Sequence, residues 1–158
     1  MKTCIYIFSL LFIIAGLSAQ AQTVDHKFIT LIVSQPDSTS ISSLKKMGYR
    51  ADKDGDFRFV ADGKVKSLVS YVKANPDAGQ NQTYWSFQAR GKKVYAPILK
   101  EIKKGAQIKK GTHFGKPRTE YKSPEGLYYY PFEDSMFDGL YWIYASKESL
   151  LESSSAAE

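Results

Sequence analysis

Residues 118–145, RTEYKSPEGLYYYPFEDSMFDGLYWIYA, predict a sheet of short strands joined by turns. Three runs within this stretch, 118–121, 127–132 and 140–145, are rich in the residue types that strands favour. Glycine and proline residues stand between the runs, as they do in turns. Because such short connections suit antiparallel neighbours, the stretch favours an antiparallel sheet.

Further strands are expected upstream of this stretch. Residues 83–90 alternate apolar and polar side chains, which predicts a half-buried strand. Asp54-Gly55 tolerates the positive φ angles of a tight turn, so it predicts a hairpin. Four further strands are expected. Residues 49–52 and 57–60 are the two arms of that hairpin, residues 28–33 form an almost wholly apolar run, and residues 94–96 form a short β-rich run.

Apolar residues spaced three or four apart predict the helices. The first covers residues 41–47 and ends at Gly48. The second covers residues 65–72, where apolar side chains fall at i, i+3, i+4 and i+7. Pro97 begins a third, shorter helix that ends at Gly105.

Helices and strands mix without a regular βαβ rhythm, so the predicted class is α+β. We expect a single small domain over residues 22–145, built on a mostly antiparallel β-sheet with two or three short helices. Residues 146–158 are polar and small, and they are expected to form a polar C-terminal tail.

The first 21 residues have the features of a cleaved secretory signal peptide. Lys2 supplies the positive end, residues 5–17 are mostly apolar, and Ala19-Gln20-Ala21 fits a cleavage site. The protein is therefore expected to be exported, periplasmic or secreted, after cleavage near Ala21/Gln22. Cys4, the one cysteine, leaves with this leader, so we expect a soluble product without disulfides or a membrane span.

Positive charge is concentrated in the middle of the chain, which has a net charge of +6. Residues 90–122 hold eleven basic side chains against Glu101 and Glu120. Two interpretations stay open: a patch for an anionic ligand, or a solvated surface that keeps the protein soluble. The lysine pairs expected to bind a ligand are Lys92 and Lys93, Lys103 and Lys104, and Lys109 and Lys110.

Aromatic residues are concentrated just after the basic segment. Successive residues of a strand point to opposite faces, so Tyr129 cannot share a face with Tyr128 and Tyr130. Some of the rings are therefore expected to stand outside the core, where they offer contact area to a ligand. Tyr128, Tyr130 and Trp142 are the candidates, and ordinary packing between strands is the alternative.

One polar group within the basic segment has the composition of an acid–base site. His113, Arg118 and Glu120 include an imidazole, a cation and a carboxylate, which would suffice for metal-free cleavage of RNA. The alternative is a surface pair between Arg118 and Glu120, with His113 in a loop.

Metal and cofactor motifs are not expected. Asp52, Asp54 and Asp56 alternate as in a calcium loop, but Phe57 and Gly63 occupy the sixth and twelfth positions, where glycine and glutamate are needed. A hairpin tip is the better interpretation of these carboxylates.

The sequence therefore predicts an exported, non-catalytic binding or interaction module. Its partner would be an anionic polymer, a carbohydrate-bearing ligand (a glycan) or an acidic protein surface. A small exported metal-independent phosphodiesterase of the ribonuclease type and a structural envelope component are the alternatives. The oligomeric state is left open by the sequence.

Overall fold

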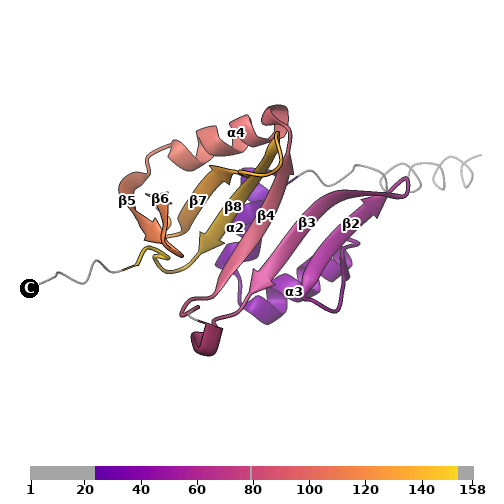
Figure 1. The fold of residues 1–158 in the computed structure, drawn as a ribbon. Helices are drawn as coiled ribbons and strands as arrows, with labels where there is room; N and C mark the ends of the chain where they lie inside the picture. Colours follow the sequence, from indigo (N-terminus) through magenta and orange to yellow (C-terminus); the bar gives the residue numbers. More distant parts are fainter. Residues whose placement is uncertain (1–23, 79, 153–158) are drawn as a thin grey trace, which may run out of the picture.

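An eight-stranded antiparallel sheet forms the centre of the computed structural model, which describes residues 24–78 and 80–152. The strands lie in the order β1-β2-β3-β4-β8-β7-β6-β5. Figure 1 shows α2 and α3 behind the sheet and α4 above it. The predicted α+β class, with a mostly antiparallel sheet and short helices, is confirmed. The predicted leader lies outside the described residues.

The elements follow one another along the chain with short connections. The helices are α2 (His26–Ser34), α3 (Asp37–Lys46) and α4 (Lys92–Lys103), with a 3-10 turn at Pro76–Ala78. The strands are β1 (Arg50–Ala51), β2 (Asp56–Ala61), β3 (Lys64–Val72), β4 (Tyr84–Arg90), β5 (Gln107–His113), β6 (Lys116–Lys122), β7 (Tyr128–Glu133) and β8 (Leu140–Ser146).

The sheet consists of two halves of the same topology. In each half a helix precedes four antiparallel strands: α3 precedes β1 to β4, and α4 precedes β5 to β8. The last strands of the halves pair with each other, and Phe87 lies opposite Ile143. Phe87 also pairs with Val69 and Ile143 with Pro131, so Phe87 and Ile143 occupy equivalent places. The two halves are thus related by an approximate twofold axis between β4 and β8.

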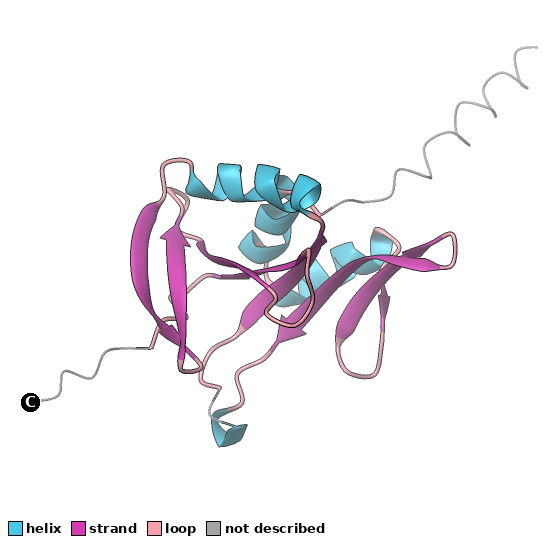
Figure 2. Ribbon diagram, turned by 45° about the horizontal axis from the view of Figure 1, so that its top comes forward, coloured by secondary structure: helices cyan, strands magenta, loops and turns pink. Residues whose placement is uncertain are grey.

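The main hydrophobic core lies between the sheet and its helices, on what we call the covered face. Ile29 and Ile32 of α2, Leu44 of α3 and Ile102 of α4 are buried there. They pack with the inward side chains of β3, β4 and β8: Val69, Trp85, Phe87, Ala89, Tyr141, Ile143 and Ala145. Figure 2 shows how the helices line this side of the strands.

A smaller core lies on the opposite face of the sheet, which we call the open face because no described helix packs on it. Tyr84 and Tyr130 are buried here beneath Leu150 and Leu151. Leu150 is completely buried, although it falls within the range predicted as a polar tail. Residues 147–152 therefore pack against one end of the open face.

The structure confirms several elements expected from the sequence and corrects three. The helix predicted at 41–47 is part of α3, and Gly55 has a φ of 85° in the predicted hairpin turn. The strands predicted at 83–90, 118–121, 127–132 and 140–145 correspond to β4, β6, β7 and β8. Three predictions are wrong. The strand predicted at 28–33 lies in α2, and the strand predicted at 94–96 lies in α4. The helix predicted at 65–72 lies in β3.

Physical reasons explain these three corrections. Asp25 caps α2 by accepting a hydrogen bond from the Phe28 N–H at 2.7 Å, so the apolar run begins as a helix. Pro97 lies inside α4, where the proline removes only one backbone hydrogen bond near the first turns. β3 carries apolar side chains on both faces, since Val69 packs in the main core and Val72 in the smaller one. Because this strand carries apolar side chains on both faces, their spacing along the sequence resembled that of an amphipathic helix.

Candidate functional site

The open face contains a hollow of about 600 Å³ over its middle strands, at the end of the sheet where β4 ends and β8 begins; we call it the central hollow. Leu68 of β3, Gln88 of β4 and Trp142 of β8 line it. These side chains lie on one face because β3, β4 and β8 pair in register, with Gln88 directly opposite Trp142. The loop between β7 and β8 contributes Phe137 to its wall. The hollow is therefore mainly apolar, with an aromatic ring on two sides.

The loop beside this hollow is held in a defined shape by Asp134. One carboxylate oxygen accepts hydrogen bonds from the Met136 N–H at 2.8 Å and the Phe137 N–H at 3.2 Å. The other accepts one from the Trp142 indole Nε1 at 2.8 Å. These bonds, with that to Met136 first, hold the pKa of Asp134 below its ordinary value. The loop presents Met136 and Phe137 with 81% and 61% of their surface exposed.

Basic side chains outnumber acidic ones on the open face. Strand alternation and register place these basic residues there: Arg50, Arg58, Arg90, Lys109, Lys116, Arg118 and Lys122. Asp56 and Glu120 are the acidic residues of the strands on the same face. Within residues 24–78 and 80–152 the ion pairs are Arg58–Asp52 and Lys66–Asp62, so the basic residues of 90–122 carry unneutralised charge.

The six lysines predicted to bind a ligand do not share one surface. Lys92, Lys93, Lys103 and Lys104 are exposed on or just after α4, on the covered side of the sheet. Lys109 and Lys110 are neighbours on β5, so they point to opposite faces. Lys109 alone of the six belongs to the open face.

The aromatic residues predicted to bind a ligand also divide. Tyr130 is fully buried, so its ring cannot contact a ligand at the surface. Tyr130 is therefore no longer a candidate ligand-binding residue. Tyr128 is half-buried beside the Lys122 ammonium, 5.3 Å from the ring centre. Trp142 is half-buried and lines the central hollow. Tyr129 points to the covered face, as alternation predicts, and its hydroxyl lies 3.1 Å from that of Thr30.

His113, Arg118 and Glu120 lie on the same face of the β5–β6 hairpin, as their register requires. Glu120 is buried, and its carboxylate accepts hydrogen bonds from the Tyr130 and Ser149 hydroxyl groups. The Arg118 guanidinium lies over the Phe132 ring, 4.1 Å from its centre. The carboxylate therefore holds the strands and the 147–152 segment together, and the surface pair expected between Arg118 and Glu120 is absent from the described ion pairs.

His113 is buried beneath the same segment. Its Nδ1 donates a hydrogen bond to the Leu150 carbonyl at 2.9 Å, which leaves Nε2 as the acceptor of the neutral ring. Burial, the largest cause, lowers the pKa of His113, and the nearby charge of Arg118 lowers it further. Nε2 is buried without a hydrogen-bond partner among the described residues. The predicted loop position of His113 is wrong, because it ends strand β5.

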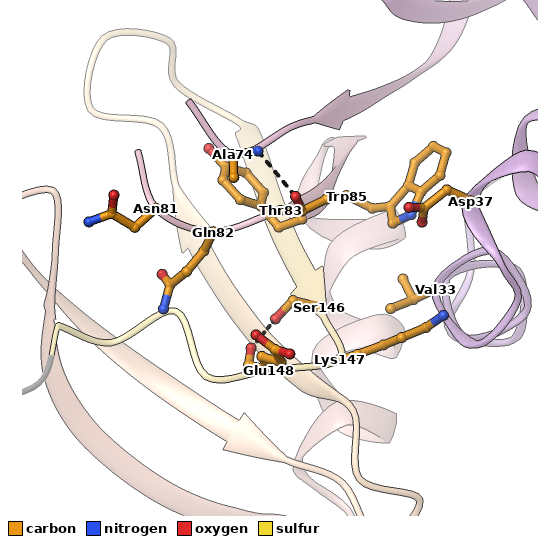
Figure 3. Close-up of a pocket in the computed structure, with 11 residues that line it drawn as sticks. Val33, Asp37, Ala74, Asn81, Gln82, Thr83, Trp85, Ser146, Lys147 and Glu148 are labelled. Atoms are coloured by element: carbon orange, nitrogen blue, oxygen red, sulfur yellow. Dashed lines mark hydrogen bonds between the residues drawn. The ribbon is translucent and has the colours of Figure 1, made fainter. Parts of the chain in front are cut away.

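A polar pocket of about 310 Å³ lies where the 146–148 segment approaches α2 and α3 (Figure 3). Two charged side chains that line it, Lys147 and Asp37, already have hydrogen-bond partners. Lys147 Nζ donates to the Gln35 carbonyl at 2.7 Å, and Asp37 accepts a hydrogen bond from Tyr71. Thr83 accepts one from the Ala74 N–H at 3.1 Å, which closes the loop that borders the pocket. These contacts support a structural role for the pocket.

The aspartates at the first hairpin form a turn. Asp52 Oδ1 accepts hydrogen bonds from the Asp54 N–H at 2.9 Å and the Asp56 N–H at 3.1 Å. Its other oxygen lies 2.8 Å from the Arg58 guanidinium. In the part of the chain that the structure describes, no group of three or more histidine, cysteine or acidic side chains could hold a metal ion.

Sequence reasoning missed most of the central hollow. Leu68, Gln88 and Arg90 carry no local signal, because only the pairing of distant strands brings them beside Trp142. Residues 134–139 offered a signal, since an Asp-x-x-x-Asp-Gly loop between two strands is typical of a hairpin connection.

Comparison with known proteins gave no match to a family model, to a curated protein or to a solved structure. None of the helices in the described ranges is both long and apolar enough to cross a membrane.

Proposed function

We propose that this protein is a non-catalytic binding module that docks an acidic protein surface on the open face of its sheet. The observation that carries the proposal is the apolar hollow around Trp142, set in a face with an excess of basic side chains. Protein interfaces concentrate binding energy in such central aromatic anchors and gain association rate from complementary charge.

The loop at 134–139 supports a protein partner over a simple anionic polymer. Met136 and Phe137 are the most exposed large apolar side chains in the loop, and Asp134 fixes the loop that carries them. A polyanion would gain from the basic residues but would have little use for exposed apolar side chains. A preorganised apolar projection beside an apolar hollow suits a folded protein partner.

The charge distribution supports an acidic partner. Arg90 borders the hollow together with Asp134 and Asp138, and Lys116 and Arg118 add positive charge on the same face of the sheet. None of them forms an ion pair within the described residues. A partner that brought carboxylates to this face would meet charge that the protein leaves unneutralised.

The phosphodiesterase alternative receives no comparable support. Glu120 lies beneath residues 149–151 and already accepts two hydroxyl hydrogen bonds, and His113 Nδ1 is bonded to Leu150. The Glu120 carboxylate, which would have to act as the general base, is therefore buried and already bonded within the fold.

Site-specific photo-cross-linking in cells that naturally produce the protein tests the proposal. A cross-linking side chain at Phe137 would sample the open face, and one at Lys100, exposed on α4, is the matched control. We expect an adduct with one acidic protein at position 137 but not at 100. With the purified partner, Arg90→Glu should weaken binding, and added salt should do the same. Equal adducts at both positions, or none at 137, would refute the proposal.

A further inference from the structure

A third cavity, a hollow of about 330 Å³, lies at the end of the sheet where the β5–β6 turn meets residues 80–82 and 150–152. Asn81 and Gln82 separate it from the polar pocket of about 310 Å³, which they also line. It is separate from the hollow around Trp142, and the two share no lining residue. Its volume lies at the small end of the range for ligand pockets, which suits a molecule of about one sugar ring.

His113 lines this hollow, and one of its ring nitrogens is buried without a partner among the described residues. His113 is only 6% exposed, and its Nδ1 is bonded to the Leu150 carbonyl. Its Nε2 is buried and has no hydrogen-bond partner among the described residues. Leaving a buried polar atom unpaired costs free energy, so such an atom calls for an explanation. A ligand hydroxyl that donated to Nε2 would supply one.

An aromatic ring stands beside this nitrogen. Phe114, half exposed at the tip of the β5–β6 turn, has a φ of 50°, a conformation uncommon for an aromatic residue. Its ring centre lies 4.3 Å from that of His113. The turn is fixed by Glu152, which accepts hydrogen bonds from the Gly115 N–H at 3.0 Å and the Thr112 hydroxyl at 2.6 Å. The ring is thus held at the mouth of the hollow.

Amide side chains complete the wall. Gln82 donates its amide N–H to the Ser149 carbonyl at 2.6 Å, and Gln80 donates to the Lys73 carbonyl at 2.9 Å. These bonds fix the two side chains and use at least one N–H group of each amide, while the amide oxygens have no partner among the described residues. The exposed Asn81 lies between them.

We propose that this hollow is a subsite for a neutral sugar ring, stacked on Phe114 and hydrogen-bonded through a hydroxyl to His113 Nε2. An aromatic surface beside several fixed acceptors suits a ring with apolar C–H faces and hydroxyl donors at its rim. The proposal does not rest on the function proposed for the open face, because the two sites share no residue.

The test uses the whole protein with glucose, mannose, galactose and N-acetylglucosamine as probes. Long-range ¹H–¹⁵N spectra report the Nε2 of His113 directly. We expect at least one of these sugars to shift that signal, and saturation transfer to show contact through its C–H protons. A histidine signal that none of the four sugars moves would overturn the proposal.

Two variants and a matched control locate the binding. Phe114→Asn removes the ring while asparagine tolerates the positive φ, so the turn should survive. We expect it to weaken sugar binding by about threefold to tenfold. Asn81→Ala, at an exposed position, should also weaken binding without disturbing the fold. Phe137→Asn, which removes a comparably exposed ring from the other hollow, should leave sugar binding unchanged. Equal loss in Phe114→Asn and Phe137→Asn, or loss in neither, would also overturn the proposal.

Discussion

The Tyr130 hydroxyl donates a hydrogen bond to the Glu120 carboxylate, and both side chains are buried on the open face. The same Tyr130 oxygen accepts a hydrogen bond from the Leu150 N–H. Burial, together with the bonded carboxylate, raises the pKa of Tyr130, so the phenol stays neutral. One phenol therefore joins β6, β7 and the segment that follows β8.

Tyr130→Phe should destabilise the fold by about 1 to 3 kcal/mol, because it removes one of the two hydroxyl donors to the buried Glu120 carboxylate and leaves the Leu150 N–H without a partner. Urea denaturation measures the change. Tyr128→Phe is the matched control two residues away on the same strand, where the hydroxyl makes no hydrogen bond within the described chain, and it should cost less than about 0.5 kcal/mol. Equal effects from the two variants would contradict the structural role of the Tyr130 phenol.

Leu150→Ala should lower the free energy of unfolding by about 2 to 5 kcal/mol, because this side chain is fully buried on Tyr84 and Tyr130. Leu31→Ala makes the same chemical change at a position on α2 that is 40% exposed, and it should cost much less. Thermal unfolding of the two variants compares them directly. A small effect at Leu150 would mean that the segment 147–152 behaves as the tail that the sequence predicted.

The elements that the sequence predicted correctly are those whose signals are local. The Asp54-Gly55 turn, the helix with Leu44 and the strands around Trp85 and Trp142 each follow from turn chemistry or from periodicity. The wrong predictions fall where packing between distant segments determines the secondary structure. The run 28–33 is β-rich in composition, yet Ile29, Ile32 and Val33 share one face of a capped helix. Residues 65–72 appeared helical because their strand has a core on each face.

The candidate site was less predictable than the fold, because strand register assembles it. The sequence singled out Trp142 and the basic residues but could not tell that Leu68 and Gln88 lie beside that ring. It also grouped Lys109 with Lys110, which strand alternation sends to opposite faces. It grouped His113 with Glu120 correctly in space, but the chain beyond β8 covers both.

Acidification should destabilise the protein through His113. The pKa of this buried side chain lies below the ordinary 6.5, so the unfolded chain takes up a proton before the folded one does. The stabilising contribution is complete above pH 6.5 and falls as the pH drops from there through the lower folded pKa. Arg118 and Glu152 are the charged groups whose fields act on the ring, in opposite directions.

The measurement compares the urea midpoints of the wild type and His113→Gln over that window. Glutamine removes the titration and still offers an N–H to the Leu150 carbonyl. The carboxylate of Glu152 has a pKa below its ordinary 4.5, so its own loss of stability begins only at lower pH. Parallel pH profiles for the two proteins between 6.5 and 4.5 would contradict the prediction.

Gly111→Ala should destabilise the fold by crowding the segment after β8. A Cβ at this position would lie 3.1 Å from Leu151 Cδ1, which is closer than ordinary contact allows. We expect a cost of about 1 kcal/mol or more from the displaced leucine. The double variant Gly111→Ala, Leu151→Ala should be less destabilised than the sum of the single variants, because the clash is gone. Strict additivity would show that the contact does not matter.

Charge reversal distinguishes the open face from the helix side as the binding surface. A polyglutamate column serves as a simple acidic surface, and the wild type should be retained at low salt and released as salt rises. Lys109→Glu with Lys116→Glu alters two exposed residues of the open face, and Lys92→Glu with Lys93→Glu alters two on α4. Each double variant changes the net charge by the same amount, so any difference in retention between them reflects the position of the reversed charges. Both pairs are exposed, and each should change stability by less than about 1 kcal/mol.

We expect the open-face double variant to lose more retention than the α4 double variant, because carboxylates approaching the open face also meet Arg118. Greater loss from the α4 pair would move the binding surface to the helix side and contradict the proposed function, and equal retention of all three proteins would reduce the basic residues to a solubilising role.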